Sequence, residues 1–159
     1  MRLVLALDRA LGRVLELAKW LVLPVVILLF LQWPLRDLVQ AYSREANDLG
    51  QWIFALFMAA AVTAATRERI HLAADNFAQR YAPAWRRGIA RAGALAGLVP
   101  WALFVLYSSS NTVWMSVRQL ESFPDTLNPG YFLVKLALWL LAGLLLLQAI
   151  VDACRPRQA

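Results

Sequence analysis

One short segment, TRERIHLAADNF at residues 66–77, holds the side chains whose types and spacing could do chemistry. It contains His71, the one histidine of the chain, with Asp75 four residues later and Glu68 three residues earlier. Residues four apart are neighbours on a helix, so His71 and Asp75 can share a charge-assisted hydrogen bond. An imidazole held by a carboxylate is found in general bases, proton relays and metal ligands, and it also serves simply to fix a helix.

The rest of the sequence weighs against the catalytic uses of His71. A bis-histidine haem needs two histidines, and the single Cys154 excludes an intramolecular disulfide and a Cys-based structural zinc site. General-base or relay chemistry needs further ionisable groups, and the apolar stretches carry no chain of Asp, Glu or His. A metal held by one histidine and one or two carboxylates stays open. We expect no catalytic residue, metal or cofactor, and a structural role at a membrane surface for four residues: Arg67, Arg69, His71 and Asp75.

The composition indicates a membrane protein. The 159 residues are 61% hydrophobic and 16% charged, and they include seven Trp. The apolar residues are gathered into long blocks, and the arginines stand at the ends of these blocks. Arginines in such places encode membrane topology, so the net charge of +6 is not taken as a nucleic-acid surface. We predict one all-α integral membrane domain over residues 1–159.

Four of the apolar blocks are long enough to cross a bilayer, which takes about 20 helical residues. The third block is the least apolar, because Pro100 interrupts it and the polar run SSSN at 108–111 lies near its far end. We expect this run at the outer membrane surface, unless another protein covers it. The predicted spans are residues 15–33, 49–66, 89–113 and 131–151.

The Lys and Arg counts orient these spans. Five arginines lie in the connection between the second and third spans, whereas the loops on the other side hold three. The positive-inside rule therefore predicts that both termini and the 67–87 connection are cytoplasmic. Within that connection we predict a short amphipathic helix in the membrane interface, with Phe77 and Tyr81 toward lipid or protein and His71 on the polar side. The candidates for contact with lipid headgroups are Trp33, Arg80, Trp85, Arg86 and Arg87.

The order of these features resembles the small membrane subunit of tripartite ATP-independent periplasmic (TRAP) transporters, the DctQ-like or Q component. The resemblance covers about residues 15–152. It rests on the basic residues, His71 and Asp75 after the second span, where the family has the acidic residue three positions after the histidine rather than four. The other matching positions are Ser122, Pro124 and Pro129 in the outer loop and Lys135 and Gln148 in the last span.

The resemblance implies a non-catalytic subunit of a bacterial inner-membrane transporter. Its partners would be a large elevator-type permease subunit (the M component), a periplasmic substrate-binding protein (the P component) and membrane lipids, with no nucleic acid. The system would couple sodium to the uptake of an organic anion, typically a carboxylate. The residues we expect to contact protein partners are the GxxxG pair Gly93 and Gly97, together with Arg118, Glu121, Asp125 and Lys135.

Two other classes of protein fit parts of the sequence. A four-span membrane enzyme would use His71, Asp75 and Glu68 as its ionisable groups, and alanine at His71 would then abolish activity without affecting assembly. A membrane anchor of a respiratory or similar complex would receive its cofactor mostly from a partner.

Overall fold

The computed structural model describes residues 2–38, 43–68, 81–82, 85, 88–89 and 92–154. Within these ranges the chain is helical, apart from connecting loops and one isolated β-bridge between Ser122 and Pro129. The prediction of an all-α protein is confirmed. The described helices form four rods, made of α1 (Arg2–Ala18), η1 (Lys19–Leu21) and α2 (Val22–Asp37); α3 (Arg44–Glu68); η2 (Ala94–Leu98) and α6 (Val99–Arg118); and α7 (Tyr131–Cys154).

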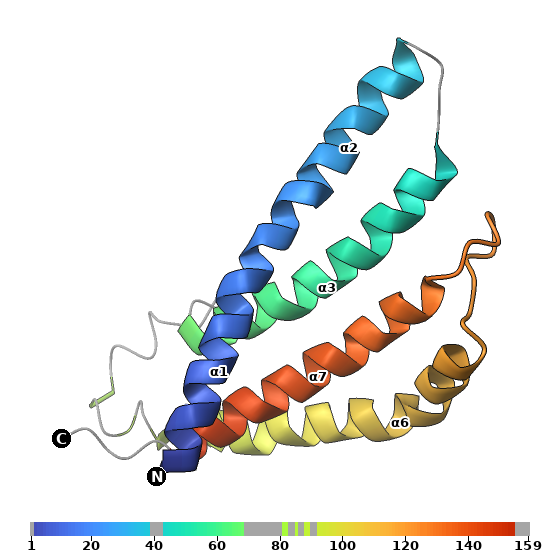
Figure 1. Ribbon diagram of the computed structural model, residues 1–159. Helices are drawn as coiled ribbons and strands as arrows, with labels where there is room; N and C mark the ends of the chain where they lie inside the picture. Colours follow the sequence, from blue (N-terminus) through green and yellow to red (C-terminus); the bar gives the residue numbers. More distant parts are fainter. Residues whose placement is uncertain are drawn as a thin grey trace.

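The rods lie side by side and fan apart from α2 to α6 (Figure 1). α3 packs along α7, α6 packs on the other side of α7, and α2 packs against α3. α1 contacts both α3 and α7. The bundle therefore has an α1 end, where α3 and α7 finish, and a loop end, where residues 119–130 join α6 to α7.

Three of the described rods are long and apolar enough to cross a membrane: Val4–Pro34, Arg44–Glu68 and Tyr131–Cys154. The first begins well before the predicted residue 15, because α1 runs into η1 and α2 without a break. The second extends past both ends of the predicted 49–66, and the last agrees closely with 131–151. The rod of η2 and α6 lies where the third span was predicted and is less apolar.

Prolines mark the two irregular places in the rods. Pro24 has no N–H to donate to the carbonyl of Trp20, and the 3₁₀ turn η1 includes that residue. Pro100 likewise cannot donate to Ala96, which lies in the π-helical stretch η2. At Pro100, where the sequence predicts a kink, the rod changes from the π-helical η2 to the α-helical α6.

The α1 end is packed through small residues on α3. Leu11 and Leu15 of α1 are buried against Ala60, with Ala64 and other partly buried residues around them. Alanine on α3 allows this close approach, and close packing is what holds helices together in a membrane, where lipid is as apolar as leucine. Ala60 and Ala64 of α3 thus form a packing face for α1.

The polar run SSSN is not at the end of its helix. α6 continues past residues 108–111 for almost two more turns, to Arg118. The indole Nε1 of Trp139 donates to Ser109 Oγ at 3.0 Å, which fixes this run against α7. Val113 and Ser116, beyond the run, are buried, so α6 continues past the run as a packed helix.

Candidate functional site

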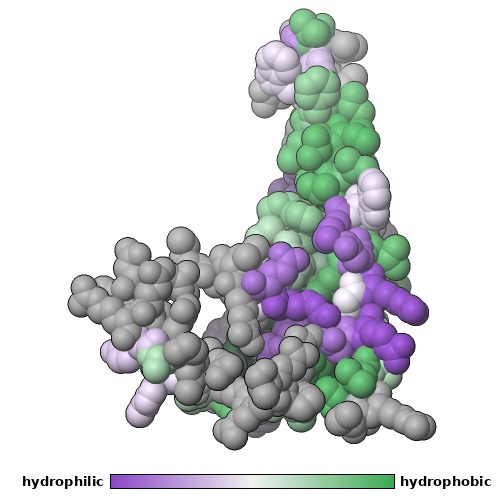
Figure 2. Space-filling model, turned by 90° about the vertical axis from the view of Figure 1, so that its left-hand side faces the viewer, coloured by the Kyte–Doolittle hydropathy of each residue, from purple (hydrophilic) through white to green (hydrophobic). Residues whose placement is uncertain are grey.

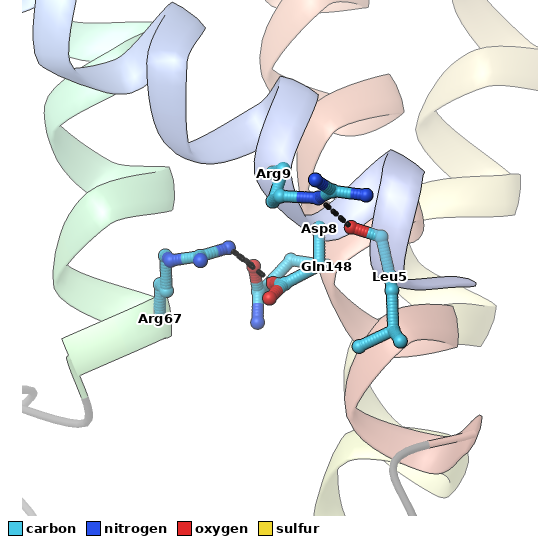
Figure 3. Close-up of polar contacts among 5 residues, drawn as sticks. All are labelled: Leu5, Asp8, Arg9, Arg67 and Gln148. Atoms are coloured by element: carbon cyan, nitrogen blue, oxygen red, sulfur yellow. Dashed lines mark hydrogen bonds and ion pairs between the residues drawn. The ribbon is translucent and has the colours of Figure 1, made fainter. Parts of the chain in front are cut away.

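A polar cluster ties three helices together at the α1 end (Figure 3). Arg67, in the last turn of α3, places its Nη1 2.7 Å from Asp8 Oδ1 of α1. The same nitrogen donates to Gln148 Oε1 of α7 at 3.4 Å. We call Asp8, Arg67 and Gln148 the α1-end clamp. Arg67 of α3 thus contacts a residue of α7 that lies 81 positions later in the sequence, and its ion pair with Asp8 adds α1 as a third helix.

The clamp is built into the bundle rather than laid on its surface. Gln148 is fully buried, and the Asp8 and Arg67 side chains are 20% and 25% exposed. A Cβ at Gly12 would lie 3.4 Å from Arg67 Nη2, so the guanidinium rests close to the glycine backbone of α1. Glycine at this position therefore leaves room for the arginine between α1 and α3.

The amide of Gln148 is only half used within the described residues. Its oxygen accepts the bond from Arg67, whereas its Nε2 has no hydrogen-bond partner among them. A buried amide group without a partner costs about 1–3 kcal/mol. Among the described residues, Gln148 is therefore fixed by one hydrogen bond, the one that its oxygen accepts from Arg67.

A second polar cluster holds the loop end. Asp48, near the start of α3, is 7% exposed, and its Oδ2 accepts a short hydrogen bond from Thr126 Oγ1. The amide nitrogen of Asn128 donates to the same oxygen at 3.4 Å, and the backbone N–H of Asn128 donates to Thr126 Oγ1 at 3.3 Å. We call Asp48, Thr126 and Asn128 the loop-end clamp. It fastens the loop between α6 and α7 to α3.

The backbone of this loop is folded tightly. Leu120 follows α6 with φ +46°, and the Glu121 N–H donates to the Ser116 carbonyl at 3.0 Å, which closes the helix in a Schellman motif. Gly130 has φ +141°, and a Cβ there would lie 3.4 Å from the ring of the buried Phe123. Glycine is therefore required where the loop enters α7.

An ion pair completes the loop end. Lys135 Nζ lies 2.5 Å from Glu121 Oε2 and 5.2 Å from the ring centroid of Tyr131. The Tyr131 ring in turn meets Phe123 edge to face, with centroids 5.5 Å apart. The hydrogen bond from Lys135 lowers the pKa of Glu121 below its ordinary value.

The predicted site residues fall into three groups. Arg67 belongs to the last turn of α3, where it pairs with other helices, and Glu121 and Lys135 pair with each other. Exposed positions hold Trp33, Trp85, Gly93, Gly97, Arg118 and Asp125. A Cβ at either glycine of the GxxxG pair would meet nothing within 4 Å, so this pair packs on no described part of the chain. The predicted interfacial helix and the remaining residues lie outside the described ranges: Arg69, His71, Asp75, Arg80, Arg86 and Arg87.

Sequence reasoning missed the two carboxylates that organise the clamps. Asp8 lies in an amphipathic segment before the first predicted span, and Asp48 lies just ahead of the second. Their partners are distant in sequence, so spacing gives no hint of the pairing. The available signal was position, since a carboxylate at the edge of an apolar block needs donors when the block is buried.

The described surface separates into a charged zone and an apolar zone. Figure 2 shows hydrophilic side chains gathered midway along one face, below a largely hydrophobic upper part. α2 forms the upper part of the bundle in Figure 1, and its exposed residues include Leu23, Val26, Ile27 and Phe30. Glu16 and Lys19, beside and within η1, form an exposed ion pair with a 2.5 Å separation. An apolar face of this kind suits a lipid environment.

The arrangement can join helices, and it offers little for reaction chemistry. Among the described residues, no three His, Cys, Asp or Glu side chains are grouped to hold a metal ion. The charged groups of both clamps face partners on neighbouring elements. Their chemistry is therefore that of salt bridges and hydrogen bonds between helices.

The chain was also compared with known proteins. Neither a curated protein nor a solved structure matches it. Residues 25–159 match the family described as tripartite ATP-independent periplasmic transporters, DctQ component. The match covers most of the chain, including all of α3, α6 and α7. Together with its apolar helices, this match shows that the chain is a membrane protein of the DctQ family, the small permease component of TRAP transporters.

Proposed function

We propose that this chain is a fixed, non-catalytic scaffold for a large elevator-type permease subunit in a bacterial inner membrane. The system takes up an organic anion, typically a carboxylate, with sodium, after a periplasmic binding protein has delivered it. The observation that carries this proposal is the DctQ match over residues 25–159. The family works with a large DctM subunit and a periplasmic binding protein, which supplies the identity of the partners.

The packing of the described helices supports a scaffold role. The polar side chains of the clamps connect different elements of the bundle. Arg67 joins α1, α3 and α7, and Asp48 joins α3 to the loop between α6 and α7. A moving element would need two arrangements of such contacts, whereas ties at both ends of the bundle favour one. A fixed subunit of this kind lends rigidity to a larger moving partner.

The same proposal includes the topology. Both termini and the 67–87 connection lie in the cytoplasm, and the rod of η2 and α6 is the fourth crossing helix. The excess of arginines in that connection supports this orientation. His71, Asp75 and Arg69 then fix a cytoplasmic interfacial helix that follows Arg67 at the end of α3. Arg80, Trp85, Arg86 and Arg87 meet lipid headgroups on that side, and Trp33, at the far end of α2, meets those on the opposite side.

Co-purification tests the proposal. The tagged chain is co-expressed with the large membrane protein encoded beside it, and the pair is passed through size-exclusion chromatography in mild detergent. We expect one stoichiometric complex. A folded chain that elutes alone would contradict the scaffold role, and His71 would again become the residue to explain.

Charge reversal at the loop end tests whether this surface docks partners. Arg118 and Asp125 are exposed, and neither belongs to the described ion pairs. If they contact the binding protein, Arg118→Glu and Asp125→Lys will reduce uptake while the membrane complex still assembles. Loss of assembly instead would place these residues against the large subunit.

A further inference from the structure

One side of α6 is uncovered along most of its length. Six exposed residues recur every three or four positions and share one face of the helix, which we call the α6 outer face: Phe104, Tyr107, Ser108, Asn111, Trp114 and Met115. The opposite side, with Ala102, Val113 and Ser116, is buried in the bundle. The α6 outer face therefore points away from every described helix.

The middle of this face lies deep in the bundle. Ser109 is hydrogen-bonded to Trp139, which follows the start of α7 by eight residues, or about 12 Å of helix. Fifteen residues, or about 22 Å, separate Trp139 from the end of α7 at Cys154. α7 is apolar enough to cross a membrane. In a membrane-crossing α7, a position about 12 Å from one end and about 22 Å from the other falls within the hydrocarbon core, which is about 30 Å thick.

At that depth, lipid offers no hydrogen-bond partner for the side-chain amide of Asn111. The hydroxyls of Ser108 and Ser110, which precede Asn111, donate within their own helix, to the Val105 and Tyr107 carbonyls respectively. The Asn111 carboxamide is exposed and has no hydrogen bond to any other described side chain or backbone group. An amide without partners in hydrocarbon costs several kcal/mol, so another protein group must cover it.

The exposed face of α2 differs from the α6 outer face in its polarity. Phe30 of α2 is 69% exposed and Phe104 of α6 is 68% exposed, so the two rings are equally uncovered. Phe30 is surrounded by Val26, Ile27 and other apolar residues, whereas Phe104 shares its face with Ser108 and Asn111. Lipid suits the first surface completely and the second only in part.

We propose that the α6 outer face is the surface that binds the large permease subunit, through a membrane helix with a hydrogen-bonding side chain opposite Asn111. This inference rests on the proposed function, which supplies the partner. Tyr107, which is 83% exposed, and Trp114 provide broad aromatic contacts on either side of the amide. Gly93 and Gly97, both exposed, allow a close approach of helices at the other end of the same rod.

Photo-cross-linking in the intact complex tests this assignment. A benzoylphenylalanine probe replaces Phe104 or Tyr107 on α6 and, as a matched control, Phe30 on α2. Each variant is co-expressed with the large subunit, irradiated in membranes and purified through a tag on this chain. We expect covalent adducts with the large subunit from both α6 positions and none from Phe30.

A second variant measures the contribution of the amide. Asn111→Leu should retain about three- to tenfold less large subunit on purification, the range given by one polar contact between membrane helices. Ser110→Ala is the control, because that hydroxyl is already bonded within its own helix. It should retain as much partner as the unaltered chain.

The outcomes separate the two proposals. Adducts from Phe30 but not from α6, or no adducts although the pair co-purifies, would overturn the α6 assignment and leave the scaffold role intact. A chain that never co-purifies with the large subunit would overturn both. Adducts from Phe104 and Tyr107 with a weakened Asn111→Leu complex would establish the surface.

Discussion

The two clamps stabilise a carboxylate inside the bundle with different kinds of partner. At the α1 end, the negative charge of Asp8 meets the positive charge of Arg67, so the ion pair carries no net charge into the bundle. At the loop end, the carboxylate of Asp48 is held by a hydroxyl and an amide, which are neutral donors. In this protein, the carboxylate is paired with an opposite charge where three helices meet. Where a helix meets a loop, it is stabilised by hydrogen bonds from neutral groups.

The clamps also differ in what they constrain. Arg67 contacts α1 and α7 at once, so its loss loosens two helix contacts. Asp48 fastens residues 126 and 128, and the backbone bonds of the loop remain, such as that from Phe123 N–H to the Asn128 carbonyl at 2.8 Å. Damage at the α1 end should therefore spread through the bundle, whereas damage at the loop end should stay local.

Removing the arginine gives the largest expected effect. Arg67→Met takes the guanidinium from Asp8 and from the buried Gln148, and we expect it to lower the free energy of unfolding by about 2–4 kcal/mol. The measurement is unfolding of the purified chain in mixed micelles titrated with SDS. The control is Arg9→Met, because Arg9 is exposed and bonds within its own helix to the Leu5 carbonyl. Equal losses from the two variants would mean that the α1-end clamp adds nothing beyond a surface charge.

Removing the carboxylate at the loop end should cost less. Asp48→Ala takes the acceptor from Thr126 and Asn128, and we expect a loss of about 1.5–3 kcal/mol, the range for hydrogen bonds to a charged group. Because the effect is local, limited proteolysis should show faster cleavage within residues 119–130 at temperatures where the bundle is still folded. Asp125→Ala, in an exposed position of the same loop, is the matched control. A bundle that unfolds as a whole in the Asp48 variant would remove the distinction between the two ends.

The features that could be predicted from the sequence are those set by continuous runs of apolar residues. Three apolar helices follow from runs of about twenty residues, and the last agrees closely in its bounds because it is the purest block. Such features depend on neighbours along the chain, so period and composition are enough.

The clamps could not be predicted in the same way. Arg67 was interpreted as part of an interfacial helix, because a basic residue after a span is typical of topology signals. Its contact with Gln148 joins positions 81 residues apart, and the contact of Asp48 with Thr126 joins positions 78 apart. Only the path of α1 across α3 and α7 and the return of the loop bring these side chains together.

The smallest expected effect concerns the ion pair beside the loop-end clamp. The hydrogen bond from Lys135 holds the pKa of Glu121 below the ordinary value of 4.5, so the unfolded chain binds a proton more readily than the folded one. The contribution of this pair to stability is therefore complete above pH 4.5 and is lost as the pH falls through the lowered pKa. Glu121→Gln should remove this dependence, so the difference in melting temperature from the unaltered chain should shrink on acidification below 4.5. Lys135→Met should flatten the same profile, because it removes the cause of the shift. An unchanged acid profile in both variants would show that the clamp of Asp48, rather than the ion pair, holds the loop end alone.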